Sequence, residues 1–426
     1  MKKLLLLITI ACFTHFSFSQ NNILKEVTPA AAGVSAERLT RIDKILQEYI
    51  DKKWIAGGAA IVAKDGKIIY YKAVGYNDIV AKAPLKRDAI FRIASQTKAI
   101  TSVAVMMLYE EGKFLLDDPL SQYIPEFKDL KVLDKFNDAD TTYTTVPAKR
   151  AITIRDLLTH TSGIGYAQIG SKEANAIYYK NGIVGGIGVD NILLSDKMKK
   201  LGSMPLFHQP GEKWTYGLNT DLLGYLIEVV SGISLDEFFK IKIFEPLGMK
   251  DTYFYLPKEK YNRLAILYTE DSAKYVKVMD EYMDINGKMY RDFPAKAGTY
   301  FSGGGGLSST AMDYTIFMQM LLNGGEYNGK RILSPASVKM MTVSQFDKID
   351  WPDNKFGLGF GIYTDKSSAI SPLSPGSFEW GGMFSSSYWV DPKEKIVAQL
   401  LLNQFPNSHG EIHNKFKVLV YQALYK

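Results

Sequence analysis

The stretch Phe91-Arg92-Ile93-Ala94-Ser95-Gln96-Thr97-Lys98-Ala99-Ile100-Thr101 places a serine and a lysine at the start of a predicted helix. After Lys98, apolar residues recur at helical spacing as far as Leu108, and the pattern stops at Gly112. Because Ser95 and Lys98 are separated by about one helical turn, we expect both side chains on the same helix face.

This pair fits the chemistry of a serine nucleophile. A serine hydroxyl is a weak nucleophile until a base removes its proton, and a lysine can be that base where its surroundings favour the neutral amine. The N-terminus of a helix adds a positive field that favours a developing oxyanion. Ser-x-x-Lys also arises by chance and serine is a common helix cap, so the four residues alone leave a purely structural role open.

The longer stretch 91–101 resembles the active-site segment of the class C β-lactamase-like serine hydrolases. This superfamily also holds penicillin-binding DD-peptidases and family VIII carboxylesterases. Further similarities follow in the order expected for the superfamily, at Gly112–Leu120, Leu157–Gly163, Phe244–Met249 and Gly304–Leu307. Together they cover nearly all of the chain after its first residues. The resemblance implies an α/β domain split around a helical one.

A second chemical element is Trp214-Thr215-Tyr216-Gly217-Leu218-Asn219, followed by Asp221-Leu222-Leu223-Gly224. By resemblance, Tyr216 is the motif tyrosine, whose phenol can relay protons between serine, lysine and leaving group. The alternative is a buried aromatic ring with a locally bonded hydroxyl. Lactamases have Tyr-x-Asn, whereas this chain has Leu218 at the Asn position and Asn219 one residue late. The variant resembles family VIII esterases and related acyltransferases, and Leu218 is expected to contact substrate.

A third element is Glu379-Trp380-Gly381-Gly382-Met383, where lactamases have Lys-Thr-Gly. The Trp-Gly-Gly variant again resembles the esterases, and its glycines would let substrate approach the strand backbone. By resemblance, the backbone N–H groups of Met383 and Ser95 form the oxyanion hole. Trp380, Gly381 and Gly382 are expected to bind substrate. The structural alternative is a glycine-rich bulge with a packed tryptophan.

The order of predicted elements indicates an α+β fold. A helix over 36–50 precedes strands 58–63 and 67–73, which Asp65-Gly66 joins as a hairpin. Helices dominate the middle, with cap signals at Thr153, Ser234 and Ser334-Pro335. The segment 134–150 and much of 258–296 look like loops. Strands return at 360–364, 386–390 and 395–402, before a final helix over 412–424.

We therefore expect an antiparallel sheet flanked by helices, built from both ends of the chain, with an inserted mainly helical domain. The predicted division is a signal peptide at 1–19, a discontinuous α/β domain at 24–112 and 297–426, and a helical domain at 113–296. Segments 134–150 and 169–200 are expected to shape the pocket.

The first residues predict export. Lys2 and Lys3 precede a short apolar run over 4–13, and Ser17-Phe18-Ser19 resembles a cleavage site. The run is short for a membrane span, and no other stretch is long and apolar enough. We expect a periplasmic or secreted protein. Acylation of Cys12 is disfavoured because apolar residues follow it where a lipoprotein has polar ones.

The mixed charge of the chain favours a small molecule over nucleic acid as its main partner. The net charge is +6 with both signs interspersed, which argues against nucleic acid. Cys12 is the only cysteine, so the exported chain would have no disulfide and no thiolate metal site.

His409 and His413 lack a His-Glu-x-x-His pattern and are interpreted as surface residues, so we expect no metal and no cofactor. His160 is interpreted as a core or turn residue, and His208 has no evident partner.

Three functions remain open from the sequence. The first is a serine hydrolase that forms an acyl-enzyme on Ser95 and hydrolyses small carboxylic esters. The second keeps the nucleophile but acts on amides, as a D-amino-acid peptidase, DD-carboxypeptidase or β-lactamase. The missing Lys-Thr-Gly lysine counts against it. The third is a non-catalytic binding or scaffold protein, against which the intact Ser95, Lys98 and Tyr216 argue. There is no Gly-x-Ser-x-Gly elbow for an α/β-hydrolase. The oligomeric state is not indicated.

Overall fold

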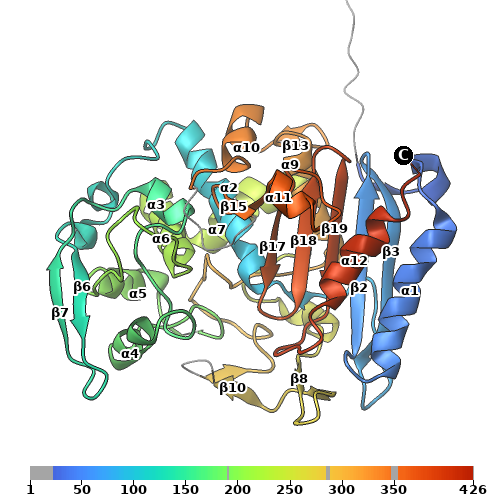
Figure 1. The fold of residues 1–426 in the computed structure, drawn as a ribbon, viewed down its shortest axis with the longest axis horizontal. Helices are drawn as coiled ribbons and strands as arrows, with labels where there is room; N and C mark the ends of the chain where they lie inside the picture. The colour runs from blue at the N-terminus through green and yellow to red at the C-terminus, as the bar shows by residue number, and fades with distance from the viewer. Residues whose placement is uncertain (1–22, 190, 285–287, 347–353, 426) are drawn as a thin grey trace, which may run out of the picture.

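A nine-stranded sheet forms the centre of the protein in the computed structural model, which describes residues 23–189, 191–284, 288–346 and 354–425 (Figure 1). The strands, in spatial order, are β1 (Lys25–Glu26), β3 (Lys67–Asp78), β2 (Gly57–Lys64), β19 (Ile396–Leu401), β18 (Ser386–Asp391), β17 (Phe378–Gly382), β16 (Gly361–Tyr363) and β15 (Asn354–Phe356), and β4 (Ala83–Pro84) pairs with β3.

The two ends of the chain meet in the middle of this sheet. β2 pairs antiparallel with β19, from Ala59 opposite Leu401 to Lys64 opposite Ile396. This confirms the predicted sheet built from both ends, and β2 and β3 form the predicted hairpin. The sheet differs from the predicted antiparallel arrangement at one edge, where the short strand β1 runs parallel to β3.

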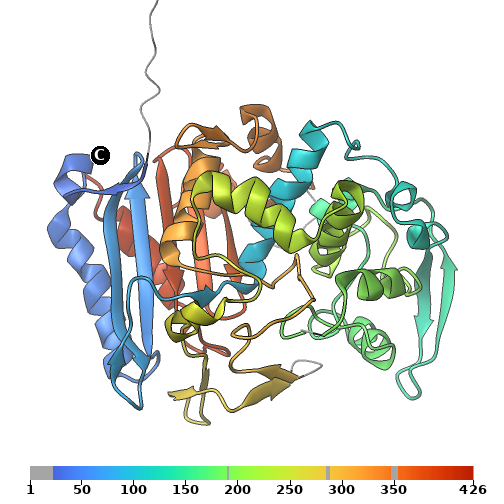
Figure 2. The same ribbon diagram turned by 180° about the vertical axis from the view of Figure 1, so that it is seen from behind.

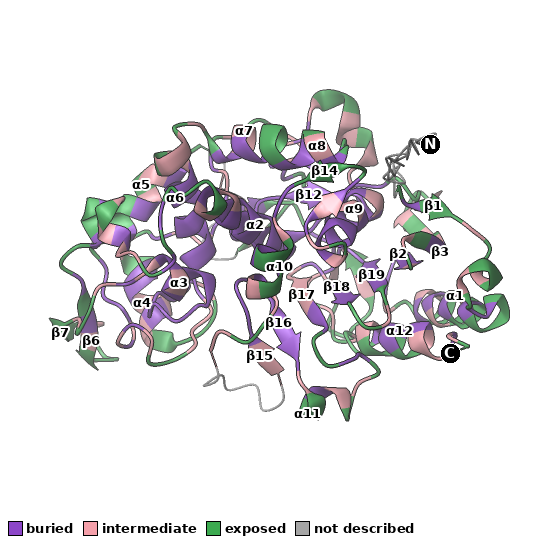
Figure 3. Ribbon diagram, turned by 90° about the horizontal axis from the view of Figure 1, so that it is seen from above, coloured by how far each residue is buried: buried purple, intermediate pink, exposed green. Residues whose placement is uncertain are grey.

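Helices cover both faces because successive strand residues point to opposite sides. Ala398 and Leu400 of β19 pack in one core with α1 (Ala36–Asp51) and α12 (Ile412–Tyr421). Val397 and Leu401 pack in the other with α2 (Thr97–Glu110) and α9 (Ala311–Leu322). Figure 1 shows α12 in front of the sheet, and Figure 2 shows the face with α9 from behind. In Figure 3, α2 and the central strands are almost wholly buried.

A mainly helical region lies beside the sheet, on the far side of α2 from the strands (Figure 1). Its helix α6 (Asn219–Ser231) packs along α2, so the nucleophile segment lies between the sheet and the helices. The remaining helices are α3 (Ile154–Leu158), α4 (Lys172–Lys180), α5 (Leu194–Leu201), α7 (Leu235–Phe239), α8 (Glu245–Leu247), α10 (Pro335–Met341) and α11 (Asp365–Ser368). The caps predicted at Thr153, Ser234 and Ser334 are formed.

The prediction of a loop over 134–150 was wrong. This segment belongs to a hairpin of β6 (Lys131–Phe136) and β7 (Tyr143–Pro147) that projects from the helical region (Figure 1). Both strands are largely exposed, so the sequence lacks the apolar alternation that marks a half-buried strand. Cross-strand backbone bonds and β-branched residues such as Thr144 and Thr145 form the hairpin without that pattern.

Small two-stranded sheets complete the fold. They are β5 (Phe91–Arg92) with β12 (Ser308–Ser309), β8 (Tyr268–Glu270) with β9 (Val276–Val278), β10 (Tyr282–Asp284) with β11 (Lys288–Tyr290), and β13 (Glu326–Tyr327) with β14 (Lys330–Arg331). β8 to β11 lie within 258–296, where mostly loop was predicted. Across the described residues, no helix is long and apolar enough to cross a membrane. The predicted signal peptide lies outside these residues, and the domain boundaries stay a prediction.

Candidate active site

Ser95 lies in a single 3-10 turn, Ala94–Gln96, that leads directly into α2. The turn is anchored on both sides, because Ile93 N–H donates to Leu307 O at 3.1 Å and Tyr314 OH donates to Gln96 O at 2.9 Å. Ala94 has φ of +44°, a left-handed conformation that is strained for a residue with a Cβ. The surrounding contacts therefore hold a strained backbone immediately before the predicted nucleophile.

Lys98 reaches Ser95 from the first turn of α2, as its spacing predicted. Its side chain is buried, and Nζ donates to Ser95 Oγ at 3.3 Å, Tyr166 OH at 3.1 Å and Gly304 O at 2.6 Å. An ammonium group has three N–H donors, so these three acceptors account for all of them. The ammonium is thus held in one orientation beside Ser95.

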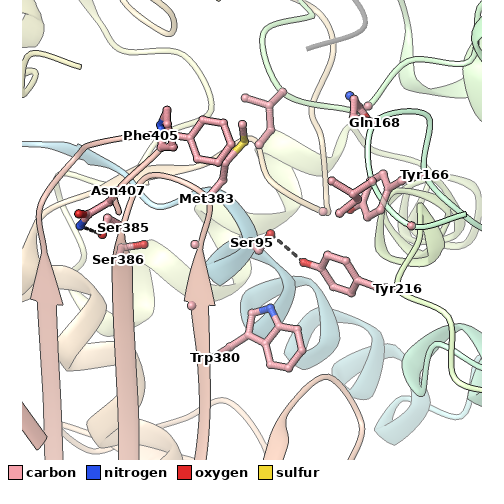
Figure 4. A pocket seen from close by; sticks show the side chains of 18 of the residues that line it. Ser95, Tyr166, Gln168, Tyr216, Trp380, Met383, Ser385, Ser386, Phe405 and Asn407 are labelled. Atoms are coloured by element: carbon pink, nitrogen blue, oxygen red, sulfur yellow. Dashed lines mark hydrogen bonds between the residues drawn. The ribbon is translucent and has the colours of Figure 1, made fainter. Parts of the chain in front are cut away.

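Tyr216 touches the same hydroxyl from the opposite side. Its OH donates to Ser95 Oγ at 2.8 Å (Figure 4), and Lys98 Nζ lies 4.7 Å from the centroid of its ring. The ring packs between aromatic neighbours, with Trp214 nearly parallel at 5.9 Å and Trp380 at 5.8 Å. The structure therefore brings together all three residues that the sequence proposed for proton transfer.

Tyr166 is a contact of Lys98 that the sequence did not predict. It is buried, and burial together with nearby Tyr216 raises its pKa well above the usual value, so its hydroxyl remains a phenol. It follows the recognised 157–163 string by three residues, but only folding shows that its OH meets Lys98.

Asp221 fixes the position of the third acceptor of Lys98. This buried carboxyl accepts from Ser302 Oγ at 2.6 Å, and burial raises its pKa. A Cβ built on Gly304 would lie 2.3 Å from Asp221 Oδ2, so only glycine lets the Gly304 carbonyl approach Lys98 from this direction.

Leu218 and Asn219, which follow Tyr216 closely in the chain, contact the protein core and do not line the pocket. Leu218 is fully buried in the core and does not line the pocket, so the expected substrate contact of its side chain is not formed. Asn219 faces His160 and Ser162, with its Nδ2 3.0 Å from His160 Nδ1. Burial lowers the pKa of His160 well below its usual value, which confirms its interpretation as a hydrogen-bonded core residue.

The end of β17 closes the site on the sheet side. A Cβ on Gly382 would lie 2.3 Å from Ile93 O, so this glycine lets the strand approach the turn that carries Ser95. A Cβ on Gly381 would meet only Ser386 O, at 3.1 Å. Met383 follows the strand directly, and Figure 4 shows it above Ser95. The close approach of β17 thus explains Gly382, whereas Gly381 is confined on one side only, by Ser386 O.

A pocket of about 1780 Å³ opens above Ser95. Tyr216, Trp380, Gly381, Gly382 and Met383 line it, together with residues of 166–187 from the helical region. The segment 169–200 therefore shapes the pocket in part, as expected. None of the lining residues in the described part of the chain comes from 134–150, because that hairpin points away.

The other histidines in the described part of the chain, His208, His409 and His413, are packed against neighbours. His208 Nε2 lies 2.9 Å from Thr215 Oγ1, and His409 stacks on Trp54 at 4.0 Å. His413 was wrongly interpreted as a surface residue: its ring lines the pocket between Ser385 and Ser387. Within the described ranges, no cluster of three or more His, Cys, Asp or Glu residues could hold a metal ion.

Known proteins share this fold over most of their length. Residues 42–422 match the β-lactamase family. Protein Rv1367c of Mycobacterium tuberculosis is 32% identical over 85% of this chain and 89% of its own. Esterase EstB of Burkholderia gladioli is 29% identical over 88% of this chain and 93% of its own. The solved structure of EstCE1, described as a hydrolase with promiscuous acyltransferase activity, superposes with a TM-score of 0.77 at 28% identity, covering 90% and 99%.

The family match spans the sheet except its edge strand β1, and it includes the Ser95 turn, the Tyr216 segment and the end of β17, which line the pocket. The chain therefore belongs to the β-lactamase family and is a serine hydrolase.

Proposed function

We propose that this protein hydrolyses small carboxylic esters through an acyl-enzyme on Ser95. One observation carries the proposal: Ser95 Oγ lies 2.8 Å from Tyr216 OH and 3.3 Å from Lys98 Nζ, at the base of an open pocket. Two proton-carrying groups within reach of one hydroxyl are what activation of a serine requires.

Acylation would begin with attack of Ser95 Oγ on the ester carbonyl carbon. Within the Tyr216–Lys98 pair, Tyr216 reacts as a phenolate beside the Lys98 ammonium, so the proton moves from Ser95 Oγ to the Tyr216 oxygen as the new C–O bond forms. The carbonyl oxygen becomes an oxyanion, which the backbone N–H groups of Ser95 and Met383 are proposed to bind. The pair then returns the proton to the departing alkoxide as the old C–O bond breaks, leaving an acyl-serine and a free alcohol.

Deacylation would repeat these steps with a water molecule. Water gives a proton to the Tyr216–Lys98 pair and attacks the acyl carbon, and the collapse of the second oxyanion returns a proton to Ser95. Lys98 supplies positive charge throughout, because its Nζ lies 3.3 Å from Ser95 Oγ and 4.7 Å from the centroid of the Tyr216 ring.

The pocket favours esters over β-lactams and D-alanyl peptides. Trp380 stands where lactamases have a lysine, and its ring packs 5.8 Å from Tyr216, so this position offers no cation to a substrate carboxylate. Leu218 stands where lactamases have an asparagine, and its buried apolar side chain offers no amide to the substrate. Sites discriminate strongly only when they pair the substrate's polar groups. The similarity to EstB and EstCE1 supports the same substrate class.

A labelling experiment tests the nucleophile. A fluorophosphonate should form an adduct that peptide mapping places on Ser95, and Ser95→Ala should abolish it. Ser408→Ala, an exposed serine outside the pocket, should label like the wild type. Undiminished labelling of Ser95→Ala would remove Ser95 from its role, and a wild type that never labels would favour the non-catalytic alternative.

A panel of substrates tests whether the enzyme prefers ester bonds to the amide bonds of β-lactams and peptides. We expect kcat/KM for p-nitrophenyl butyrate to exceed that for a chromogenic cephalosporin by roughly a hundredfold or more. Equal or better turnover of the cephalosporin, or of a D-alanyl-D-alanine peptide, would favour the β-lactamase or peptidase alternative.

We also propose that the protein is exported to the periplasm or medium. Lys2, Lys3 and the apolar run over 4–13 support this, as does the cleavage-like Ser17-Phe18-Ser19.

A further inference from the structure

The pocket has a second half on the outer side of β17, which we name the polar arm. It is formed by Glu379, Ser385, Ser387, Asn407, His413 and Lys417. In Figure 4, Ser385 and Asn407 lie on the opposite side of β17 from Tyr216 and Trp380. The same pocket therefore extends from Ser95, past the end of the strand, to these polar side chains, beside which Phe405 and Pro406 also line it.

The alternation of β17 separates the two halves. Trp380 and Gly382 face the side of Tyr216 and Ser95, whereas Glu379 and Gly381 face α12. A Cβ at Gly381 would meet only Ser386 O, at 3.1 Å, so the glycine keeps a side chain out of the passage between the two halves of the pocket. A ligand bonded at Ser95 could thus reach the polar arm without displacing a side chain of β17.

The charges of the polar arm cancel. Lys417 Nζ donates to the Glu379 carboxylate, and also to Tyr363 OH at 3.1 Å. Lys417 is almost fully buried; burial opposes its charge, but Glu379 and Tyr363 outweigh this and raise its pKa. A buried ion pair that is this closely bonded leaves neither charge free for a charged ligand.

His413 adds hydrogen-bonding capacity without charge. Burial and the nearby Lys417 ammonium lower its pKa to about 4, so the ring is neutral near pH 7. Its Nδ1 lies 2.7 Å from Ser387 Oγ and its Nε2 lies 3.1 Å from Ser385 Oγ. A neutral imidazole donates from one nitrogen and accepts at the other, so one serine donates to it and the other accepts. Ser385 Oγ also accepts from Asn407 Nδ2 at 2.8 Å. Whichever serine accepts from the ring keeps its own proton to donate, and Ser387 keeps a free lone pair in either arrangement.

We propose that the polar arm binds a neutral, hydroxyl-rich part of the substrate ester, such as a polyol or sugar alcohol group. Hydroxyl groups both donate and accept, which matches the mixed capacity of Ser385, Ser387 and Asn407. A carboxylate would need a free cation and an ammonium would need a free carboxylate, and the Glu379–Lys417 pair offers neither. The substrate assignment rests on the proposed ester hydrolysis at Ser95.

A matched pair of esters tests the proposal, since glycerol 1-butyrate and propyl butyrate differ only in two hydroxyls. We expect the wild type to favour the glycerol ester about tenfold or more in kcat/KM. Ser387→Ala and Asn407→Ala should each lower this preference about threefold or more, with turnover of propyl butyrate little changed. Ser408→Ala, on the same loop but outside the pocket, should keep the preference.

A binding measurement separates this proposal from ester hydrolysis itself. Saturation-transfer NMR with methyl α-glucoside should show binding to the wild type that the double variant Ser387→Ala/Asn407→Ala loses, with unchanged circular dichroism. Hydrolysis of both esters at equal efficiency, or the absence of glucoside binding, would overturn the polar arm and leave the role of Ser95 intact. Glucoside binding in a protein that hydrolyses neither ester would support the arm and refute the esterase proposal.

Discussion

His413→Gln should remove part of the acid sensitivity of the fold. The histidine is half-buried beside Lys417 in the folded state, where desolvation and the Lys417 ammonium lower its pKa to about 4, against an ordinary value near 6.5. Between these two values the unfolded chain binds a proton that the folded protein does not. The stabilisation from the depressed pKa is therefore complete above about pH 6.5 and is lost as pH falls toward 4.

The size of the effect follows from the two pKa values. One unit corresponds to about 1.36 kcal/mol, so between roughly pH 7.5 and pH 4.5 this histidine should account for a loss of about 2–3 kcal/mol in the free energy of unfolding. Glutamine can keep hydrogen bonds to Ser385 and Ser387 but does not titrate. The loss of stability on acidification should thus be smaller in His413→Gln by about that amount.

Urea unfolding at both pH values, followed by circular dichroism, measures the difference directly. Carboxylates that titrate over the same range contribute equally to both proteins and cancel in the comparison. Asn414→Gln, an exposed neighbour on α12, should behave like the wild type. Equal acid destabilisation of the wild type and His413→Gln, within about 0.5 kcal/mol, would refute a histidine that stays neutral in the folded protein.

Three further outcomes are expected. Lys98→Ala and Tyr216→Phe should each lower kcat for p-nitrophenyl butyrate by ~10²–10⁴, with the double variant little worse because the residues act as a unit; near-normal kcat for folded Tyr216→Phe would make that ring structural. Tyr166→Phe should lower kcat about ten- to a hundredfold with KM nearly unchanged, because one N–H of Lys98 loses its acceptor. The control is Tyr123→Phe, whose OH contacts Asp118 away from this pocket. An equal loss of kcat in the control would contradict the argument. N-terminal sequencing of protein from the periplasm or medium should begin after Ser19 or Gln20, and full-length protein in the cytosol, or a chain starting at acylated Cys12, would contradict export.

Local features were readable from the sequence because their causes lie within a few residues. The Asp65-Gly66 turn, the cap at Thr153 and the Ser95–Lys98 spacing each depend on backbone geometry over about one turn. The hairpin β6–β7 was not predicted, because its strands are exposed and their residues show no alternation of apolar and polar side chains.

The sequence by itself determined that Ser95 and Lys98 share a helix face and, through the order of its motifs, which superfamily they resemble. Only the tertiary structure decided what surrounds them. Tyr216 is 121 residues from Ser95 along the chain, and Tyr166 is 68 residues from Lys98, so no local spacing could reveal either contact. Packing also buried Leu218 in the core and turned His413 into the pocket, because a side chain's exposure depends on which distant elements cover it.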